Sequence, residues 1–503
     1  MTLLGAPPAS MEASEAAAGS VGRLTRFGAW SIVAYAAKAG AAFAVSIVVA
    51  RGLGADSLGR YSYQIWIMSL VPVLMALGVP IALNRVLPDK FGAGDADGAL
   101  AIFRWVRRIH VVALGLPAAV AAFLLLGTGA NPVLVVAVTV GIAAGLLILD
   151  YQALLTALRR FRILAVAAVA GAVVQIAGAL VGTALGVSWE GFVLLSALTL
   201  VLGLGVLVAV SRPRVRTGRS RRVAPEERRR FMRYALITSF AVAANAVIWG
   251  RPELFFLDRY GSDQELGLYA AALRLTALAA PIPIMAGQAL MPEFSWLRGS
   301  GQHEALARAF PRVCTLLAAL TAPLAFGGAI VAGAMTSVVF GGEFSGGGTA
   351  ASVLLAGAMV NALAPAATAA VLTGPRPRLA AEAGAVLVAL TLLLDVLLIP
   401  PFGPVGAAIA NVAAQIVGVL IGLVYAWHWL GLRYPVGNVL VLSGMAILSG
   451  LTALASIHLI GGAAGLGFGV ACAAVVYVVL VGRSGIVTAT DLRALLRREA
   501  VVP

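Results

Sequence analysis

Long apolar runs recur along the whole chain, and they constrain its fold more than any other feature. A helix needs about 20 apolar residues to cross a bilayer, and fourteen such runs follow one another. They lie at 28–50, 61–84, 109–127, 132–150, 163–185, 189–210, 232–257, 266–290, 313–333, 348–372, 379–399, 403–427, 436–457 and 461–482. Hydrophobic residues make up 61% of the 503 residues and charged residues 11%, so the apolar surplus has to face lipid. The sequence therefore predicts an all-α integral membrane protein.

Lysine and arginine are distributed unevenly between the two sides that these runs define. If the N-terminus lies inside, thirty of the 36 basic residues fall in inner segments, three in outer segments and three within the runs. Cytoplasmic loops carry such an excess of basic residues, so both termini are predicted to be cytoplasmic, in a bacterial inner membrane. The formal charge of +15 thus indicates topology and not nucleic-acid binding. Two cysteines and four histidines show no metal-ligand spacing, and no metal or cofactor is predicted.

An internal repeat divides the chain into two halves. Leu58-Gly59-Arg60-Tyr61 opens the second run, and Leu266-Gly267-Leu268-Tyr269 opens the eighth, 208 residues later. A second pair of similar segments consists of Trp189-Glu190-Gly191 and Gly403-Pro404-Val405-Gly406. We therefore predict about 14 transmembrane helices in two pseudo-symmetric six-helix lobes, related by an axis along the membrane normal, plus two C-terminal helices. The predicted domains are a disordered cytoplasmic tail (1–27), an N-lobe (28–210), a basic cytoplasmic linker (211–231), a C-lobe (232–430), helices thirteen and fourteen (431–482) and a cytoplasmic tail (483–503).

Three segments carry a resemblance to a known group of transporters. They are ARGLGADSLGRYSYQIWIMSLVPVLMALGVPIALNRVL (50–87), RPELFFLDRYGSDQELGLYAAALRLTALAAPIPIMAGQALMPEFS (251–295) and FGPVGAAIANVAAQ (402–415). They resemble the multidrug/oligosaccharidyl-lipid/polysaccharide (MOP) flippase superfamily, in its polysaccharide and oligosaccharide flippase branch. The resemblance implies a two-lobed bundle that moves a lipid-linked sugar by alternating access. It also implies that helices one, two, seven and eight line a central cavity.

Charged side chains inside the apolar runs are candidate site residues, because such charges are costly in a bilayer and usually functional. At a rise of 1.5 Å per residue, Lys38 lies about 15 Å into the first run and Arg274 about 12 Å into the eighth. In the fold that the resemblance implies, both face one cavity. Two cations there suit the pyrophosphate of a lipid-linked glycan. The alternative for each is a cation that pairs with carbonyls or an acid and serves packing only.

Three more charged residues are candidates for substrate contact near the outer side. Arg251 and Glu253 flank Pro252, and we expect them to pair with each other or to gate the outer cavity, with the proline permitting a bend. Arg51 is expected to meet departing substrate or, more simply, to cap the negative end of its own helix.

Several uncharged polar residues lie within the apolar runs. Asn245 is a candidate for sugar contact, and Asn411 and Gln415 are four residues apart and hence on one helical face. Interhelical hydrogen bonding is the alternative for all three. Asp395, just before two prolines, is expected at the membrane interface.

The predicted function is that of a flippase, without enzymatic activity, for an undecaprenyl-pyrophosphate-type oligosaccharide or polysaccharide precursor. Its expected partners are the lipid-linked glycan, membrane lipids and glycan assembly enzymes. The alternatives are a flippase for a lipid II-type peptidoglycan precursor and a multidrug exporter of the same superfamily. An exporter needs carboxylates inside the lobes, whereas in the first half Asp56 and Glu190 are expected at outer ends and Asp150 at an inner end. A polytopic glycosyltransferase, ligase or polymerase is disfavoured, because the outer loops are short and no catalytic pattern is present.

Overall fold

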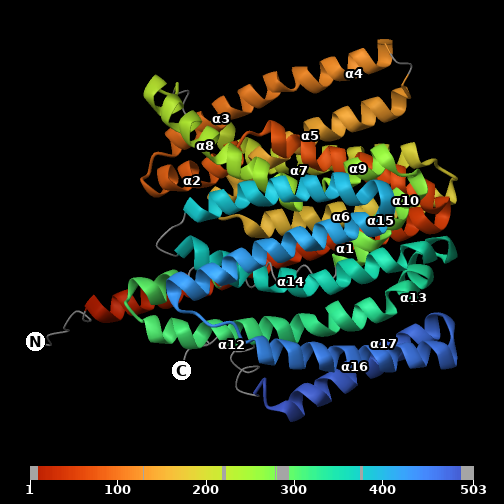
Figure 1. Ribbon diagram of the computed structural model, residues 1–503. Helices are drawn as coiled ribbons and strands as arrows, with labels where there is room; N and C mark the ends of the chain where they lie inside the picture. Colours follow the sequence, from red (N-terminus) through yellow and green to blue (C-terminus); the bar gives the residue numbers. More distant parts are fainter. Residues whose placement is uncertain are drawn as a thin grey trace, which may run out of the picture. The chain divides into compact units, whose positions relative to one another are not determined.

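The computed structural model describes residues 9–127, 130–217, 222–277, 279, 290, 294–373 and 378–488. These residues form helices and no strand, which confirms the all-α fold (Figure 1). Within the described ranges, eleven helices are long and apolar enough to span a membrane. Two of them are pairs of helices joined at a non-helical glycine, Gly54 in α1 (Ala9–Met75) and Gly403 in α15 (Arg378–Leu430). Divided there, the described residues hold thirteen spans. The remaining predicted run, 266–290, begins as α10 (Asp263–Thr276) and continues outside the described residues.

The other helices follow in chain order. In the first half they are α2 (Val79–Gly92), α3 (Ala96–Ala113), α4 (Gly115–Gly127), α5 (Pro132–Ala157), α6 (Phe161–Ala184) and α7 (Trp189–Thr217). In the second half they are α8 (Pro225–Trp249), α9 (Glu253–Tyr260), α12 (His303–Ala322), the π-helical turn η1 (Pro323–Gly327), α13 (Gly328–Phe340), the 3-10 turn η2 (Gly342–Gly347), α14 (Gly348–Thr373), α16 (Val436–Ile460) and α17 (Gly462–Ser484).

Two segments outside the predicted apolar runs are helical. The N-terminal tail, predicted to be disordered, is part of α1 from Ala9 onward, and its many alanines favour a helix. The basic inner segment after the second run forms α2 and the beginning of α3. In α3, apolar side chains spaced three or four residues apart are buried, as in Phe103 and Val106, which is the pattern of an amphipathic helix. The helical segment that holds the third apolar run therefore begins at Ala96 and ends at Gly127.

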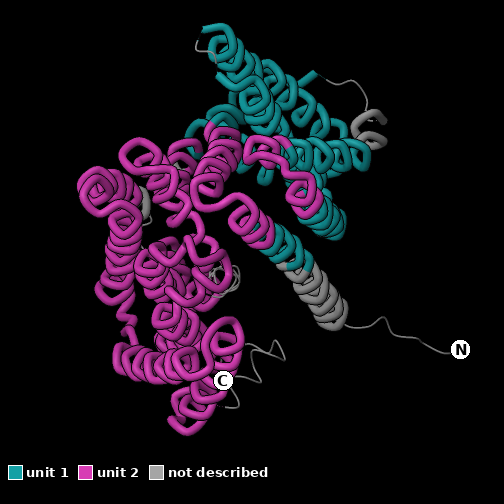
Figure 2. The backbone as a smooth tube through the Cα atoms, turned by 90° about the vertical axis from the view of Figure 1, so that its right-hand side faces the viewer, with its two compact units in different colours: residues 1–42, 75–178, 195–238 teal, residues 43–74, 179–194, 239–503 magenta. Residues whose placement is uncertain are grey.

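The helices divide into two compact units (Figure 2). Unit 1 comprises residues 1–42, 75–178 and 195–238, and unit 2 comprises 43–74, 179–194 and 239–503. Two segments of the first half, 43–74 and 179–194, therefore pack with the second half of the chain. The symmetry of two six-helix lobes stays a prediction.

Each unit has its own core. In unit 1, α2, α3, α5 and α8 meet around Leu83, Phe103, Tyr151 and Phe231, and the Phe103 and Tyr151 rings lie edge to face with centroids 5.3 Å apart. In unit 2 the core of α12, α14 and α16 is rich in alanine. Such small residues let membrane helices approach closely, where packing and not hydrophobicity drives association.

The two repeat motifs contact each other within unit 2. A Cβ atom built on Gly59 would lie 2.1 Å from the carbonyl oxygen of Asp263, and one built on Gly267 would lie 2.0 Å from that of Ala55. Only glycine permits this approach of two backbones. The flanking side chains of both motifs are buried, namely Leu58, Tyr61, Leu266 and Tyr269. The glycines of the repeat thus mark a direct backbone contact between two helix starts.

Membrane topology can be tested with single cysteines in a chain that lacks Cys314 and Cys472. We expect cysteines at positions 187 and 262 to react with an impermeant external thiol reagent, and a cysteine at 300 not to react, because of the asymmetry of basic residues. Phe344, in another predicted outer segment, is buried, so the exposed Ser345 is the better third position. Position 220, predicted to be internal, lies outside the described residues. External labelling at 300 in intact cells would contradict the orientation.

Candidate functional site

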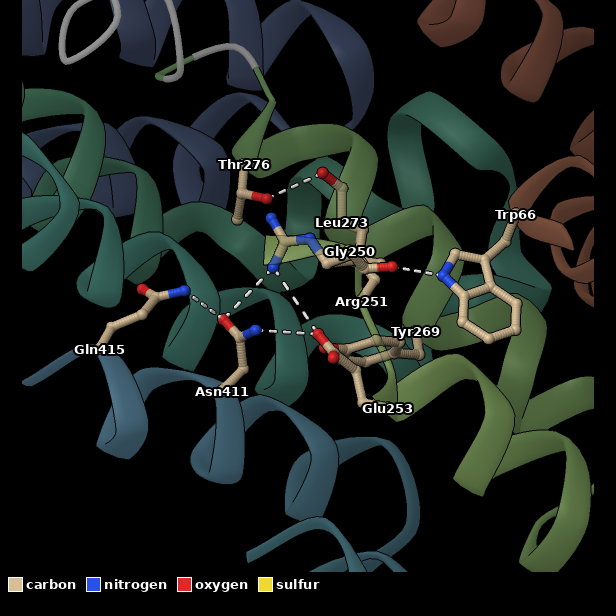
Figure 3. Close-up of polar contacts among 9 residues, drawn as sticks. All are labelled: Trp66, Gly250, Arg251, Glu253, Tyr269, Leu273, Thr276, Asn411 and Gln415. Atoms are coloured by element: carbon tan, nitrogen blue, oxygen red, sulfur yellow. Dashed lines mark hydrogen bonds and ion pairs between the residues drawn. The ribbon is translucent and has the colours of Figure 1, made fainter. Parts of the chain in front are cut away.

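A break between two helices in unit 2 forms the centre of the candidate site. α8 ends at Trp249, and α9 begins at Glu253, so the predicted bend at Pro252 is confirmed. Arg251 has a φ of 64°, which is uncommon for a residue other than glycine and is characteristic of functional positions. The indole N–H of Trp66 donates a hydrogen bond to the carbonyl of Gly250 (Figure 3). This bond satisfies a carbonyl that the helix end leaves without an intrahelical partner.

Arg251 and Glu253 belong to a buried polar network (Figure 3). Glu253 Oε1 accepts hydrogen bonds from the Tyr269 hydroxyl at 2.7 Å and from Asn411 Nδ2 at 2.9 Å, and it lies 3.7 Å from Arg251 Nη1. Asn411 Oδ1 accepts from Arg251 Nη1 at 3.3 Å and from Gln415 Nε2 at 2.7 Å. The pairing of Arg251 with Glu253 is confirmed, as is the shared helical face of Asn411 and Gln415. Tyr269 was expected only as a repeat landmark, and no sequence signal linked it to Glu253.

Two buried carboxylates in this region keep oxygens without hydrogen-bond partners. Among the described residues, Glu253 Oε2 and both oxygens of Asp395 have no partner, and both side chains are fully buried. Asp395 is expected at the membrane interface, and that depth stays a prediction; α15 continues past it through Pro400 and Pro401 to the kink at Gly403. An unpaired carboxylate is costly inside a membrane. A proton or a cation would therefore stabilise Asp395, whereas Glu253 already pairs with Arg251 through Oε1.

The second arginine of unit 2 lies near the first. Arg274 in α10 is partly buried and close enough to Arg251 for the two positive charges to repel each other. Arg251 forms an ion pair with Glu253 and donates a hydrogen bond to Asn411. Among the described residues, no carboxylate pairs with Arg274. An anion near the two guanidinium groups would therefore be favoured.

Two predicted site residues lie apart from this network. Lys38 has an exposed side chain and belongs to unit 1, so the cavity predicted to hold both Lys38 and Arg274 stays a prediction. Asn245 is exposed on α8. Neither contributes a hydrogen bond to the network of Glu253.

Arg51 caps a different helix from the one expected. Its Nε donates to the carbonyl of Val339 at 2.9 Å and its Nη2 to that of Val338 at 2.5 Å. These carbonyls belong to the last turn of α13, where intrahelical partners are missing and the helix end is negative. The expected cap on its own helix is wrong, because α1 stays helical past Arg51 up to Gly54.

An ion pair adjoins the glycine contact of the repeat. Arg60 Nη2 lies 2.6 Å from Asp263 Oδ2, and the Arg60 guanidinium lies 5.8 Å from the centroid of the Trp189 ring. We call Gly59, Arg60, Asp263 and Gly267 the outer junction, because the first three fall in segments predicted to be external and Gly267 lies at the start of the run that follows. The outer junction joins the first half of the chain to the second half within unit 2.

A buried pair in unit 1 was not predicted from the sequence. His110 Nδ1 in α3 lies 2.9 Å from each carboxylate oxygen of Asp150 in α5, and the two residues are only 3% and 0% exposed. α5 continues past Asp150 to Ala157, and the inner-end position expected for Asp150 stays a prediction. The two residues are 40 positions apart in separate apolar runs, and no motif links them. The first half of the chain therefore does hold a buried carboxylate on a candidate membrane-spanning helix.

Known proteins resemble this chain in sequence and in fold. Residues 48–346 match a family model described as "Polysaccharide biosynthesis protein". Among solved structures, "Lipid II flippase MurJ, inward closed conformation" aligns with a TM-score of 0.70 and 13% identity, over 90% of this chain and 97% of that one. An inward-facing multidrug resistance MATE family transporter of the MOP superfamily has a TM-score of 0.58 and 17% identity, over 76% of this chain and 92% of its own. No curated protein matches the sequence.

Proposed function

Since this chain belongs to the polysaccharide biosynthesis protein family of the MOP flippase superfamily, we propose that it moves a lipid-linked oligosaccharide or polysaccharide precursor across the bacterial cytoplasmic membrane. Its many apolar helices make it a multi-pass membrane protein of the transporter fold. The observation that supports this substrate class is the proximity of Arg251 and Arg274 inside unit 2.

The two arginines suit a diphosphate linkage between lipid and glycan. Hydrogen bonds from guanidinium groups to phosphate oxygens are charge-assisted and often bidentate. Bound pyrophosphate would also relieve the repulsion between the two cations. The Glu253 network holds Arg251 in place, so that side chain is positioned before substrate arrives. Arg274 then supplies the guanidinium that has no carboxylate partner among the described residues.

Alternating access supplies the route across the bilayer in this proposal. The outer junction closes the external side when Gly59 and Gly267 touch and Arg60 pairs with Asp263. Separation of these residues opens that side and releases the glycan. The ion pair is half exposed, so it contributes about 1 kcal/mol or less, and the closed state can be left at little energetic cost.

Two other transport functions remain as alternatives with distinct predictions. A flippase for a lipid II-type precursor would use the same pyrophosphate chemistry with a different glycan. A multidrug exporter is favoured by one observation, the buried carboxylates Asp150, Glu253 and Asp395, since such groups bind protons, metal cations or cationic drugs in membranes. Proteoliposomes that export a cationic dye but do not move lipid-linked glycans would favour the exporter.

Substitution of the arginines tests the proposed substrate. We expect Arg274→Ala to lower the rate of flipping about 10- to 100-fold, because a hydrogen bond to a charged group is worth about 1.5–3 kcal/mol. Arg274→Lys should restore only part of the activity, because lysine lacks the planar guanidinium group that binds phosphate through two hydrogen bonds. If Lys38 grips the same anion, Lys38→Ala and Arg274→Ala should combine to less than the sum of their effects. The measurement is flipping of a fluorescent lipid-linked oligosaccharide in proteoliposomes.

Arg259→Ala is the matched control, because Arg259 is an exposed arginine at the end of α9. It should flip at the rate of the unchanged protein. Protein yield and the thermal unfolding midpoint are recorded for every variant. Normal flipping by the Arg251→Ala/Arg274→Ala double variant would refute the anion site and leave the fold untouched. Loss of folded protein in Arg274→Ala would instead assign that charge to packing.

A further inference from the structure

A groove in unit 1 lies between α2 and the first turns of α8. It has a volume of about 540 Å³. Three arginines line it, together with apolar side chains that include Val86, Phe231 and Ile237; the arginines are Arg85, Arg230 and Arg233. None of these residues belongs to the network of Glu253 or to the outer junction, and the flippase proposal leaves the groove without a role.

The arginines come from two helices and converge on one space. Arg230, Arg233 and Ile237 are spaced by three and four residues, which places them on one face of α8. The guanidinium of Arg85 lies 4.7 Å from the centroid of the Tyr234 ring, and this cation–π contact orients Arg85 within the groove. The side chains of Arg85, Arg230 and Arg233 are exposed, so a ligand can reach them.

A lysine pairs with two of the three acidic groups that line the groove. Lys90 Nζ lies 2.9 Å from Asp95 Oδ2 and 2.9 Å from Glu227 Oε1. Partial burial lowers the pKa of Lys90, but the hydrogen bonds to these two carboxylates outweigh that effect and raise the pKa above its ordinary value. Lys90 therefore stays charged and links the corner between α2 and α3 to the start of α8. Apart from these two acids, only Asp89 opposes the three arginines.

The position of the groove along α8 points to the surface of the membrane. Arg233 is the last charged residue before an uncharged stretch that runs to the end of α8 at Trp249. Basic residues that border an apolar span lie at the level of lipid headgroups on the cytoplasmic side. Ile237, one turn further into the span, is 66% exposed. The groove is thus basic where headgroups lie and apolar where acyl chains begin.

We propose that this groove binds the phosphate of an anionic phospholipid of the inner leaflet, with the first methylene groups of its chain along Ile237. A free phosphate ion would use the arginines and leave the apolar wall empty. A bound lipid would tie α2 to the start of α8 through both, and so stabilise this end of unit 1.

Lipid binding to purified full-length protein tests the proposal. Native mass spectrometry in detergent counts phospholipids that stay bound after addition of phosphatidylglycerol or phosphatidylcholine, and inorganic phosphate is added alone in a parallel thermal unfolding series. We expect phosphatidylglycerol to bind more tightly than phosphatidylcholine and to raise the unfolding midpoint, whereas inorganic phosphate should not raise it. Arg230→Gln/Arg233→Gln should weaken phosphatidylglycerol binding roughly fivefold per arginine.

The matched control is Arg222→Gln/Arg229→Gln, which removes the same charge from exposed positions outside the groove. It should keep the affinity for phosphatidylglycerol. Equal weakening in both double variants would overturn the proposal in favour of diffuse attraction. Stabilisation by inorganic phosphate alone would overturn the lipid assignment. Asp89→Asn, which removes the opposing carboxylate, should strengthen binding, and an unchanged affinity there would also count against the groove.

Discussion

A crosslink between cysteines at positions 60 and 263 is expected to abolish transport. The two side chains form the ion pair of the outer junction, and beside them Gly59 and Gly267 bring two backbones into direct contact. A short bismaleimide would hold the junction closed, and alternating access requires that it opens. Flipping by the crosslinked protein should fall to the level of protein-free liposomes. A cleavable version of the reagent should return activity after reduction.

The control crosslink joins two helices that are not expected to separate. The side chains of Asn438 in α16 and Thr315 in α12 are in direct contact, with Nδ2 of Asn438 donating to Oγ1 of Thr315 at 3.4 Å, so cysteines at these positions can be bridged. That bridge should leave flipping unchanged. Both pairs are tested in a chain whose Cys314 and Cys472 are replaced by alanine. Full transport by protein crosslinked between 60 and 263 would show that the outer junction does not open.

Removal of one partner from the buried pair of unit 1 is expected to destabilise the protein strongly. His110→Ala leaves the Asp150 carboxylate in a fully buried position without the imidazole that contacts both of its oxygens. Breaking a buried pair in this way costs about 3–5 kcal/mol. Asp150→Asn should cost less, because the amide oxygen still accepts a hydrogen bond from the ring. The thermal unfolding midpoint in detergent measures both effects.

The double variant distinguishes a coupled pair from two independent residues. His110→Ala/Asp150→Asn removes the uncompensated charge together with its partner, so it should be more stable than the sum of the two single effects predicts. Additive losses would mean that the two side chains do not stabilise each other.

Tyr151, whose hydroxyl accepts a hydrogen bond from Arg107 Nη1 at 2.9 Å, offers a neighbouring polar contact of the same unit. Tyr151→Phe should cost about 1 kcal/mol, which calibrates the assay.

Several properties of this protein could be predicted from the sequence because they depend on local composition. Apolar runs of the length of a bilayer determine that the chain is helical and membrane-spanning. The bend at Pro252 follows from a missing amide hydrogen. The glycines of the Leu-Gly-x-Tyr motifs marked two helix starts. The position of Asn411 and Gln415 on one helical face followed from their spacing of four residues.

Only the tertiary structure decided which polar groups meet. Glu253 and Asn411 are 158 residues apart, and no local pattern indicates that their helices are neighbours. The depth of Asp150 and Asp395 depends on how far α5 and α15 continue, and helix ends are the least predictable feature of a sequence. Arg51 could cap any helix end within its reach, and packing brought it to α13. Polar groups inside a membrane pair with one another in most cases, but the identity of the partner is a property of helix packing.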